Sequence, residues 1–217
     1  MTSTLRIESW SMPAACLGPV SPLPALGRIS SPFPVDDLDP TIPHADRQSI
    51  GQGVDAPIVP YPIQDGYDRD RRPRDFRVAV LENRILRAVF LLDYGGRLWS
   101  LFDKSAEREL LYVNPVFQPT NLAIRNAWFS GGVEWNMSVV GHSPFTCEPL
   151  FAGRVQGDDC VPVLRLYEWE RVRGLIFQLD AYLPREAPFL FVRIRLINAN
   201  RWPIPTYWWS NIAVPES

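Results

Sequence analysis

The stretch "FRVAVLENRILRAVFLLDYGGRLWSLFDK", residues 76–104, decides the fold class. It alternates β-branched and aromatic residues with polar ones, and it is interrupted by turn-forming residues only at residues 82–83 and 95–96. Alternating runs of this kind, bounded by turn residues, are typical of β-strands. The stretch therefore predicts three consecutive strands.

Three segments closer to the C-terminus continue this pattern. "VPVLRLYEWERVRGLIFQLDAYLP" predicts a hairpin that turns near Arg173 and Gly174, and "TYWWSNIAV" predicts one more strand. "FLFVRIRLINANRW" alternates with the period of two expected of a half-buried antiparallel strand. No segment predicts an amphipathic helix longer than a turn or two. We therefore expect an all-β chain folded as an antiparallel β-sandwich or barrel.

The N-terminal third has a different composition. More than half of the 22 prolines lie before residue 76. Proline fixes φ and removes a backbone donor, so this region cannot be a regular helix or a central strand. Its apolar residues, such as Trp10, Ile58 and Tyr61, still need burial. We expect residues 1–75 to form an extended proline-rich arm packed on the core, and residues 76–217 to form the sandwich.

Composition excludes several function classes. The net charge is −2 and the arginines are scattered, which argues against a nucleic-acid partner. No apolar stretch is long enough to span a membrane, and the N-terminus lacks the apolar run of a signal peptide. Cys16, Cys147 and Cys160 have no metal-binding spacing and leave one thiol unpaired, which favours a reducing compartment. We expect a soluble cytoplasmic protein without a cofactor or metal.

Five segments, taken in order, carry a family resemblance: "QSIGQGVDAPIVPYP", "VAVLENRILRAVFLLDYGGRLWSLFDKSAERELLY", "NPVFQPTNLAIRNAWFSGGVEWN", "GHSPFTCEPL" and "YWWSNIAV". Together they resemble domain of unknown function fifty-one oh seven, a family of bacterial proteins that often carry tetratricopeptide repeats after the β domain. That family is in turn similar to the galactose-mutarotase-like supersandwich of aldose epimerases and of domains of several glycoside hydrolases. The resemblance covers roughly Gln48 to Val214 and implies a supersandwich fold.

Two departures from that resemblance limit what it implies. The chain ends at "AVPES", where such a domain continues with further strands, so we expect only the N-terminal part of a supersandwich, without repeats. Aldose epimerases carry a catalytic histidine in the strand that "YWWSNIAV" resembles, whereas this sequence has Ser210 and Asn211 there. Their general-base carboxylate would lie beyond Ser217. Mutarotase chemistry therefore does not transfer directly.

The stretch "SGGVEWNMSVVGH", residues 130–142, is the best candidate for a site. Sugar chemistry needs groups that carry protons near ring and glycosidic oxygens, and Glu134 and His142 form the best acid–base pair in the chain. A glutamate among aromatic residues can have its pKa raised toward neutrality. We expect the two side chains within roughly 10 Å of each other on one cavity. The alternative is a glycine turn in which Glu134 only satisfies buried backbone donors.

Eight further residues are candidates for binding a sugar. Aromatic rings stack on the C–H faces of sugars, and arginine and amide groups orient hydroxyls. Alternation along a strand forces one of two adjacent tryptophans to face the other way. An arginine after a glycine turn is either a ligand clamp or a surface ion pair. The candidates are Arg97, Arg125, Trp128, Trp135, Asn136, Trp208, Trp209 and Asn211.

Two functions remain open on this sequence. The first is a carbohydrate-active domain that binds a sugar in a concave cleft, with acid–base chemistry at the anomeric carbon by glycoside hydrolysis or epimerisation. The alternative is a non-catalytic carbohydrate- or partner-binding domain of a repeat protein, with protein partners bound through repeats outside this chain. A second carboxylate facing Glu134 would favour catalysis, and the candidates for it are Asp103, Glu168 and Glu170.

Overall fold

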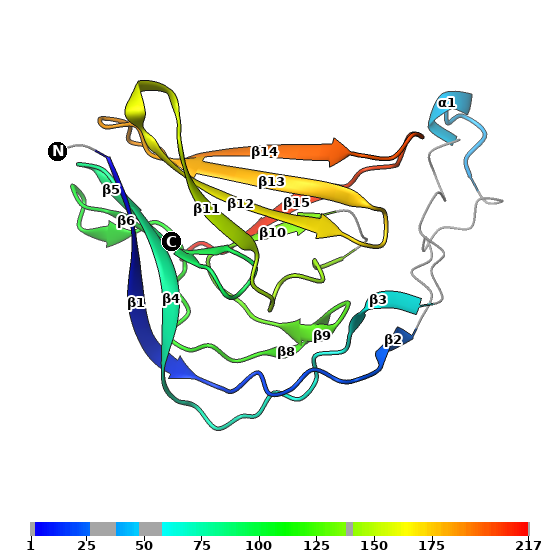
Figure 1. Cartoon of the computed structure of the whole chain (residues 1–217), viewed down its shortest axis with the longest axis horizontal. Coiled ribbons are helices and arrows are strands. Elements are labelled where there is room, and N and C mark those ends of the chain that lie inside the picture. Colours follow the sequence, from blue (N-terminus) through cyan, green and yellow to red (C-terminus); the bar gives the residue numbers. More distant parts are fainter. Residues whose placement is uncertain (1–2, 27–37, 48–57, 138–140, 217) are drawn as a thin grey trace.

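The computed structural model describes residues 3–26, 38–47, 58–137 and 141–216. Nearly all regular elements in these ranges are strands (Figure 1). The strands are β1 (Thr4–Ala14), β2 (Pro24–Leu26), β3 (Ile58–Pro62), β4 (Arg72–Glu82), β5 (Leu86–Leu91), β6 (Arg97–Asp103), β7 (Arg108–Glu109), β8 (Thr120–Ala123), β9 (Asn126–Trp128), β10 (Val133–Met137), β11 (Phe151–Gln156), β12 (Pro162–Glu170), β13 (Leu175–Tyr182), β14 (Phe191–Asn198) and β15 (Trp208–Ile212). The helical turns are α1 (His44–Arg47) and the 3₁₀ turn η2 (Asp158–Cys160). None of the helices in these ranges is long and apolar enough to cross a membrane.

Two antiparallel sheets form the body of the molecule. The larger has the strand order β1-β4-β5-β6-β10-β15, with β7 added beside β6, and the smaller has the order β11-β12-β13-β14. The pairs β2-β3 and β8-β9 form two small additional sheets. Figure 1 shows the four-stranded sheet on one side of β10 and β15 and the β8-β9 pair on the other. The predicted all-β, antiparallel sandwich is confirmed.

The larger sheet is buried on both faces, and this explains the sequence of its central strands. In β4, Ala79 and Leu81 belong to the core between the two sheets. Val78 and Val80 belong to a second core on the opposite face, together with Trp99 of β6. The sequence of a strand that is buried on both faces is a nearly continuous run of apolar residues. The site described below lies on the face of this second core.

The predicted C-terminal strands are present. β12 and β13 form the expected hairpin, and Gly174 in its turn has a φ of +65°. β14 alternates exposed and half-buried residues over its first six positions, as a half-buried strand should. β15 falls within the "TYWWSNIAV" segment and pairs with β10.

The N-terminal region is partly a regular strand rather than an arm. β1 pairs with β4 along its whole length. The physical reason is local, because residues 4–12 contain no proline and their N–H groups remain available to the ladder. After β1, the described residues before β4 contain only β2, β3 and the single turn α1.

Two of the three apolar residues expected to anchor the arm do contact the core. Tyr61 is buried in the core between the sheets, and Trp10 packs on the second core. The side chain of Ile58 lies outside the described residues. Since β4 crosses residue 75, the division of the chain at that position stays a prediction.

Candidate functional site

The pairing of β10 with β15 brings four of the predicted site residues onto one face of the larger sheet. Glu134 lies opposite Asn211, and Asn136 lies opposite Trp209. Alternation turns the intervening residues to the other face. Gly132, just before β10, has a φ of +65°, and a Cβ there would lie 2.1 Å from the carbonyl oxygen of Leu98. Glycine is therefore required where the chain passes β6 and enters β10.

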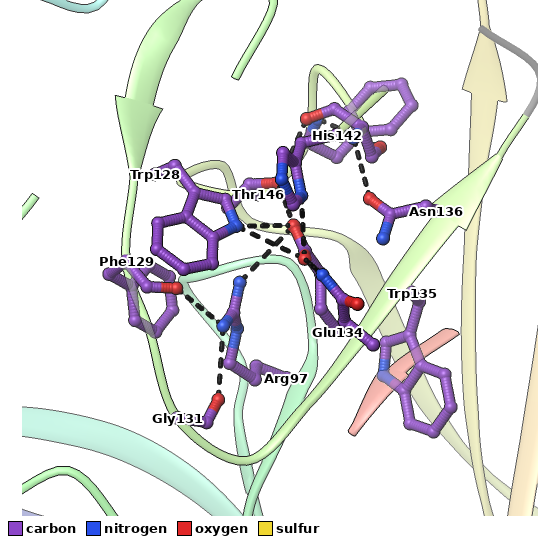
Figure 2. A network of polar contacts seen from close by, with 12 residues as sticks. Arg97, Trp128, Phe129, Gly131, Glu134, Trp135, Asn136, His142 and Thr146 are labelled. Atoms are coloured by element: carbon purple, nitrogen blue, oxygen red, sulfur yellow. Dashed lines mark hydrogen bonds and ion pairs between the residues drawn. The ribbon is translucent and has the colours of Figure 1, made fainter. Parts of the chain in front are cut away.

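The Glu134 carboxylate is the centre of the cluster (Figure 2). It accepts hydrogen bonds from Trp128 Nε1 at 3.1 and 3.2 Å, from Thr146 Oγ1 at 2.9 Å and from Asn211 Nδ2 at 3.3 Å. His142 Nδ1 lies 2.9 Å from its Oε2. These partners come from β9, β15 and the loop before β11, so the carboxylate ties together three parts of the chain.

The environment of Glu134 favours its ionised form, contrary to the expectation of a raised pKa. Burial opposes ionisation, but it is outweighed by the charge of Arg97, together with a smaller electrostatic contribution from His142. Hydrogen bonds from Trp128 and Thr146 act in the same direction, and the pKa of Glu134 lies below its ordinary value. Glu134 is thus a buried anion that accepts hydrogen bonds and is a poor proton donor.

This pKa shift makes stability depend on pH in a defined direction. A carboxyl whose folded pKa lies below its unfolded value of about 4.5 stabilises the fold above that pH, and the contribution is lost as pH falls through the folded pKa. We expect the unfolding free energy of Glu134→Gln to fall less on acidification below about pH 4.5 than that of the wild type. Urea unfolding at several pH values across this range measures the two free energies. Parallel pH profiles for the wild type and Glu134→Gln would contradict the prediction.

Arg97 is the buried counter-ion of Glu134. Its guanidinium lies 3.4 Å from Glu134 Oε1, and both side chains are 3% exposed. Nη1 donates to the carbonyl oxygens of Phe129 at 2.6 Å and Gly131 at 3.1 Å, and the group lies 3.9 Å from the centre of the Phe129 ring. Burial lowers the pKa of Arg97 to about 10, which leaves it charged at neutral pH. Arg97 is therefore an interior ion-pair partner and not a surface one.

His142 stands between two indole rings at the more exposed side of the cluster. Its ring lies 5.1 Å from that of Trp128 and 5.4 Å from that of Trp209. Because Glu134 is ionised, Nδ1 carries the proton of the Glu134–His142 hydrogen bond. Nε2 has no hydrogen-bond partner among the described residues. The predicted proximity of Glu134 and His142 is confirmed at 2.9 Å, although residues 138–140 between them lie outside the described ranges.

On β10 and β15, two buried donors of the cluster have no acceptor among the described residues. Asn136 accepts from the Ser143 N–H at 2.7 Å through Oδ1, but its Nδ2 has no partner in the described part of the chain. The same holds for Trp209 Nε1, on the neighbouring strand. Unsatisfied buried donors cost about 1–3 kcal/mol each, so an acceptor from outside would be stabilised here.

Three of the predicted binding residues lie elsewhere. Trp135 and Trp208 face the core between the sheets, where Trp135 Nε1 donates to the Gly96 carbonyl at 2.9 Å and Trp208 lies against Phe177. Arg125 donates to the Pro62 carbonyl at 2.7 Å and pairs with Glu148 at 2.7 Å. The cluster therefore contains the other predicted residues, which are Arg97, Trp128, Glu134, Asn136, His142, Trp209 and Asn211.

A family model described as "Domain of unknown function (DUF5107)" matches residues 54–217. The chain belongs to the DUF5107 family. A crystal structure of a TPR-domain containing protein from Parabacteroides distasonis ATCC 8503 is similar in fold, with a TM-score of 0.76 and 23% sequence identity. The match covers 100% of the DUF5107 chain and 33% of that protein, so the chain spans about one third of its length.

The sequence analysis missed one member of the Glu134 cluster, Thr146. Its hydroxyl lies 2.9 Å from Glu134 Oε1 and 3.0 Å from the Ser143 carbonyl oxygen. The sequence pointed to Thr146 only through its position four residues after His142 in the same short loop. That position became informative once the structure showed that the loop folds over β10. Within the described residues, no group of three or more His, Cys, Asp or Glu side chains is placed to hold a metal ion.

The three candidate second carboxylates bind backbone N–H groups near their own positions in the sequence. Asp103 accepts from the N–H groups of Ser105 and Ala106. Glu168 accepts from the Trp169 N–H, and Glu170 accepts from the N–H groups that follow it in the β12–β13 turn. Glu168 and Glu170 belong to β12, in the smaller sheet, whereas Glu134 lies in the larger one.

Proposed function

We propose that this DUF5107 chain is a carbohydrate-binding β-sandwich domain whose site is centred on the Glu134–His142 pair. The observation that carries the proposal is the 2.9 Å contact between His142 Nδ1 and Glu134, with the imidazole set between two indole rings. The contact fixes the ring and leaves Nε2 to a ligand. Flat aromatic rings beside a fixed polar group suit a ligand that is apolar on its C–H face and polar at its edge.

The unpaired donors support a sugar as the ligand. Asn136 Nδ2 and Trp209 Nε1 are buried without an acceptor in the described residues, and sugar hydroxyl and ring oxygens accept hydrogen bonds. A hydroxyl that accepts from one of these donors can donate in turn to His142 Nε2. A sugar ring that reached these donors, after a side-chain shift that uncovered them, would satisfy groups that the protein alone leaves unpaired.

Acid–base chemistry at the anomeric carbon is the finer part of the proposal. Glu134 is ionised, so it would orient His142, and His142 would carry the proton. Hydrolysis of a glycosidic bond uses a protonated carboxylic acid and a second carboxylate. The lowered pKa of Glu134, and the position of Glu168 and Glu170 in the other sheet, therefore disfavour hydrolysis.

A second candidate is a non-catalytic partner-binding domain of a repeat protein. The observation that favours it is the similarity in fold to part of a protein described as TPR-domain containing. Protein partners would then be bound through repeats of a longer chain. The free thiols of Cys16, Cys147 and Cys160 support a cytoplasmic location for either function.

Two adjacent tryptophans supply the test of the sugar site. Trp209→Phe removes the unpaired Nε1 and part of the ring beside His142, so we expect it to weaken sugar binding by about tenfold. Trp208→Phe changes the neighbouring residue on the opposite face and should leave affinity unchanged. A panel of free sugars and aryl glycosides, scored for binding by calorimetry and separately for turnover, measures both. A panel without binding, or equal effects of the two variants, would refute the proposal.

A further inference from the structure

The largest of the described cavities lies away from the Glu134 cluster, between the free edges of the two sheets. β1 ends the strand order of the larger sheet and β11 ends that of the smaller one (Figure 1). Residues of both strands line a groove of about 580 Å³ between them. Its apolar surface comes chiefly from Leu5, Ile7, Leu92, Leu150 and Phe151.

The charge on this groove is of one sign. Arg6, Arg77 and Arg154 line it, and its described lining includes no Asp or Glu. Arg6 pairs with Glu8 and Glu82, and Arg77 pairs with Asp93, and none of these carboxylates lines the groove. Arg154 has no ion-pair partner among the described residues, and it lies on β11, at the free edge. The uncompensated positive charge of the groove is therefore that of Arg154.

The edge of β11 has the properties of a strand that pairs with another chain. Five of its six residues are exposed, and no strand in the described part of the structure pairs with its outer side. A free edge without proline keeps its backbone donors open to pairing, and the Arg154 charge at this edge would select an acidic partner strand over a basic one. Gly153, in the middle of the strand, has an extended backbone with open space around it, so nothing there hinders an approaching chain.

We propose that this groove binds an extended acidic peptide, which adds to β11 as a further strand and places carboxylates against Arg154 and its neighbours. A peptide strand supplies backbone donors and acceptors to the free edge and apolar side chains to the floor. A phosphate or nucleic acid would satisfy the arginines but not the edge. A second copy of this chain is disfavoured, because antiparallel pairing of two β11 edges would bring the two Arg154 side chains together.

The test uses a labelled six-residue peptide, matched to the six residues of β11, in which valine alternates with glutamate. Fluorescence anisotropy should show binding that weakens as salt rises from about 0.05 to about 0.5 M. Arg154→Glu should weaken binding by about tenfold or more. Arg201→Glu makes the same charge change on an exposed residue outside the groove lining and should leave binding unchanged.

Further peptides test the charge preference and the backbone pairing. Replacing glutamate by lysine should abolish binding. Two further versions of the acidic peptide carry N-methyl groups on its odd-numbered or on its even-numbered residues, and at least one of these two should fail to bind. Equal binding of all these peptides, or equal binding to the wild type and Arg154→Glu, would overturn the proposal. Dimerisation of the chain through β11 without any binding of the acidic peptide would overturn it as well. None of these outcomes depends on the proposed sugar site.

Discussion

Replacing Arg97 with methionine is expected to lower the free energy of unfolding by about 3–5 kcal/mol. The substitution keeps the aliphatic length but removes the counter-ion of Glu134, whose side chain is 3% exposed and cannot turn to water. The carbonyl oxygens of Phe129 and Gly131 lose their donor at the same time. Urea unfolding followed by tryptophan fluorescence measures the change.

Arg77→Met is the matched control for this substitution. Arg77 pairs with Asp93 at 2.6 Å, but the two side chains are 60% and 39% exposed. Exposed pairs contribute at most about 1 kcal/mol, so this variant should be nearly as stable as the wild type. The double variant Arg97→Met/Glu134→Gln should recover part of the loss, because no unpaired charge remains buried. Equal losses for the two arginine variants would show that the buried pair is not special.

Strand positions could be predicted from the sequence because they depend on short-range alternation and turn residues. β4, β5 and β6 fall within the residue 76–104 stretch or just before it, and the β12–β13 turn lies where Gly174 predicts it. β1 was missed because the prolines that follow residue 12 obscured the proline-free segment before it. Pairing with β4, a contact between residues far apart in the sequence, gives that segment its structure.

The composition of the site was predictable only in part. Alternation in β15 required one tryptophan to leave the site, and register with β10 determines that it is Trp208. The same alternation in β10 places Trp135 on the face opposite Glu134, so Trp135 could have been excluded from the site on the sequence alone. By contrast, the ionisation of Glu134 depends chiefly on Arg97 from β6, with smaller contributions from His142 and Thr146 in the loop after β10, and such contacts leave no local pattern.

Replacing His142 with alanine is expected to weaken the binding of the best sugar in the panel by about thirtyfold or more. The substitution removes Nε2, the polar group left to the ligand, and opens the space between Trp128 and Trp209. If the site also epimerises sugars, turnover should fall by about a hundredfold or more, since His142 would carry the proton. Calorimetry gives the affinity, and polarimetry of a fresh sugar solution gives the turnover.

Thr146→Ala separates a contact with the ligand from a general disturbance of the Glu134 network. Thr146 and His142 both lie 2.9 Å from the Glu134 carboxylate, but Thr146 is 3% exposed and His142 is the more exposed of the two. Thr146→Ala should therefore cost stability, by about 1–3 kcal/mol, and leave affinity little changed. If it weakens binding as much as His142→Ala does, the effect arises from Glu134 and His142 does not touch the sugar.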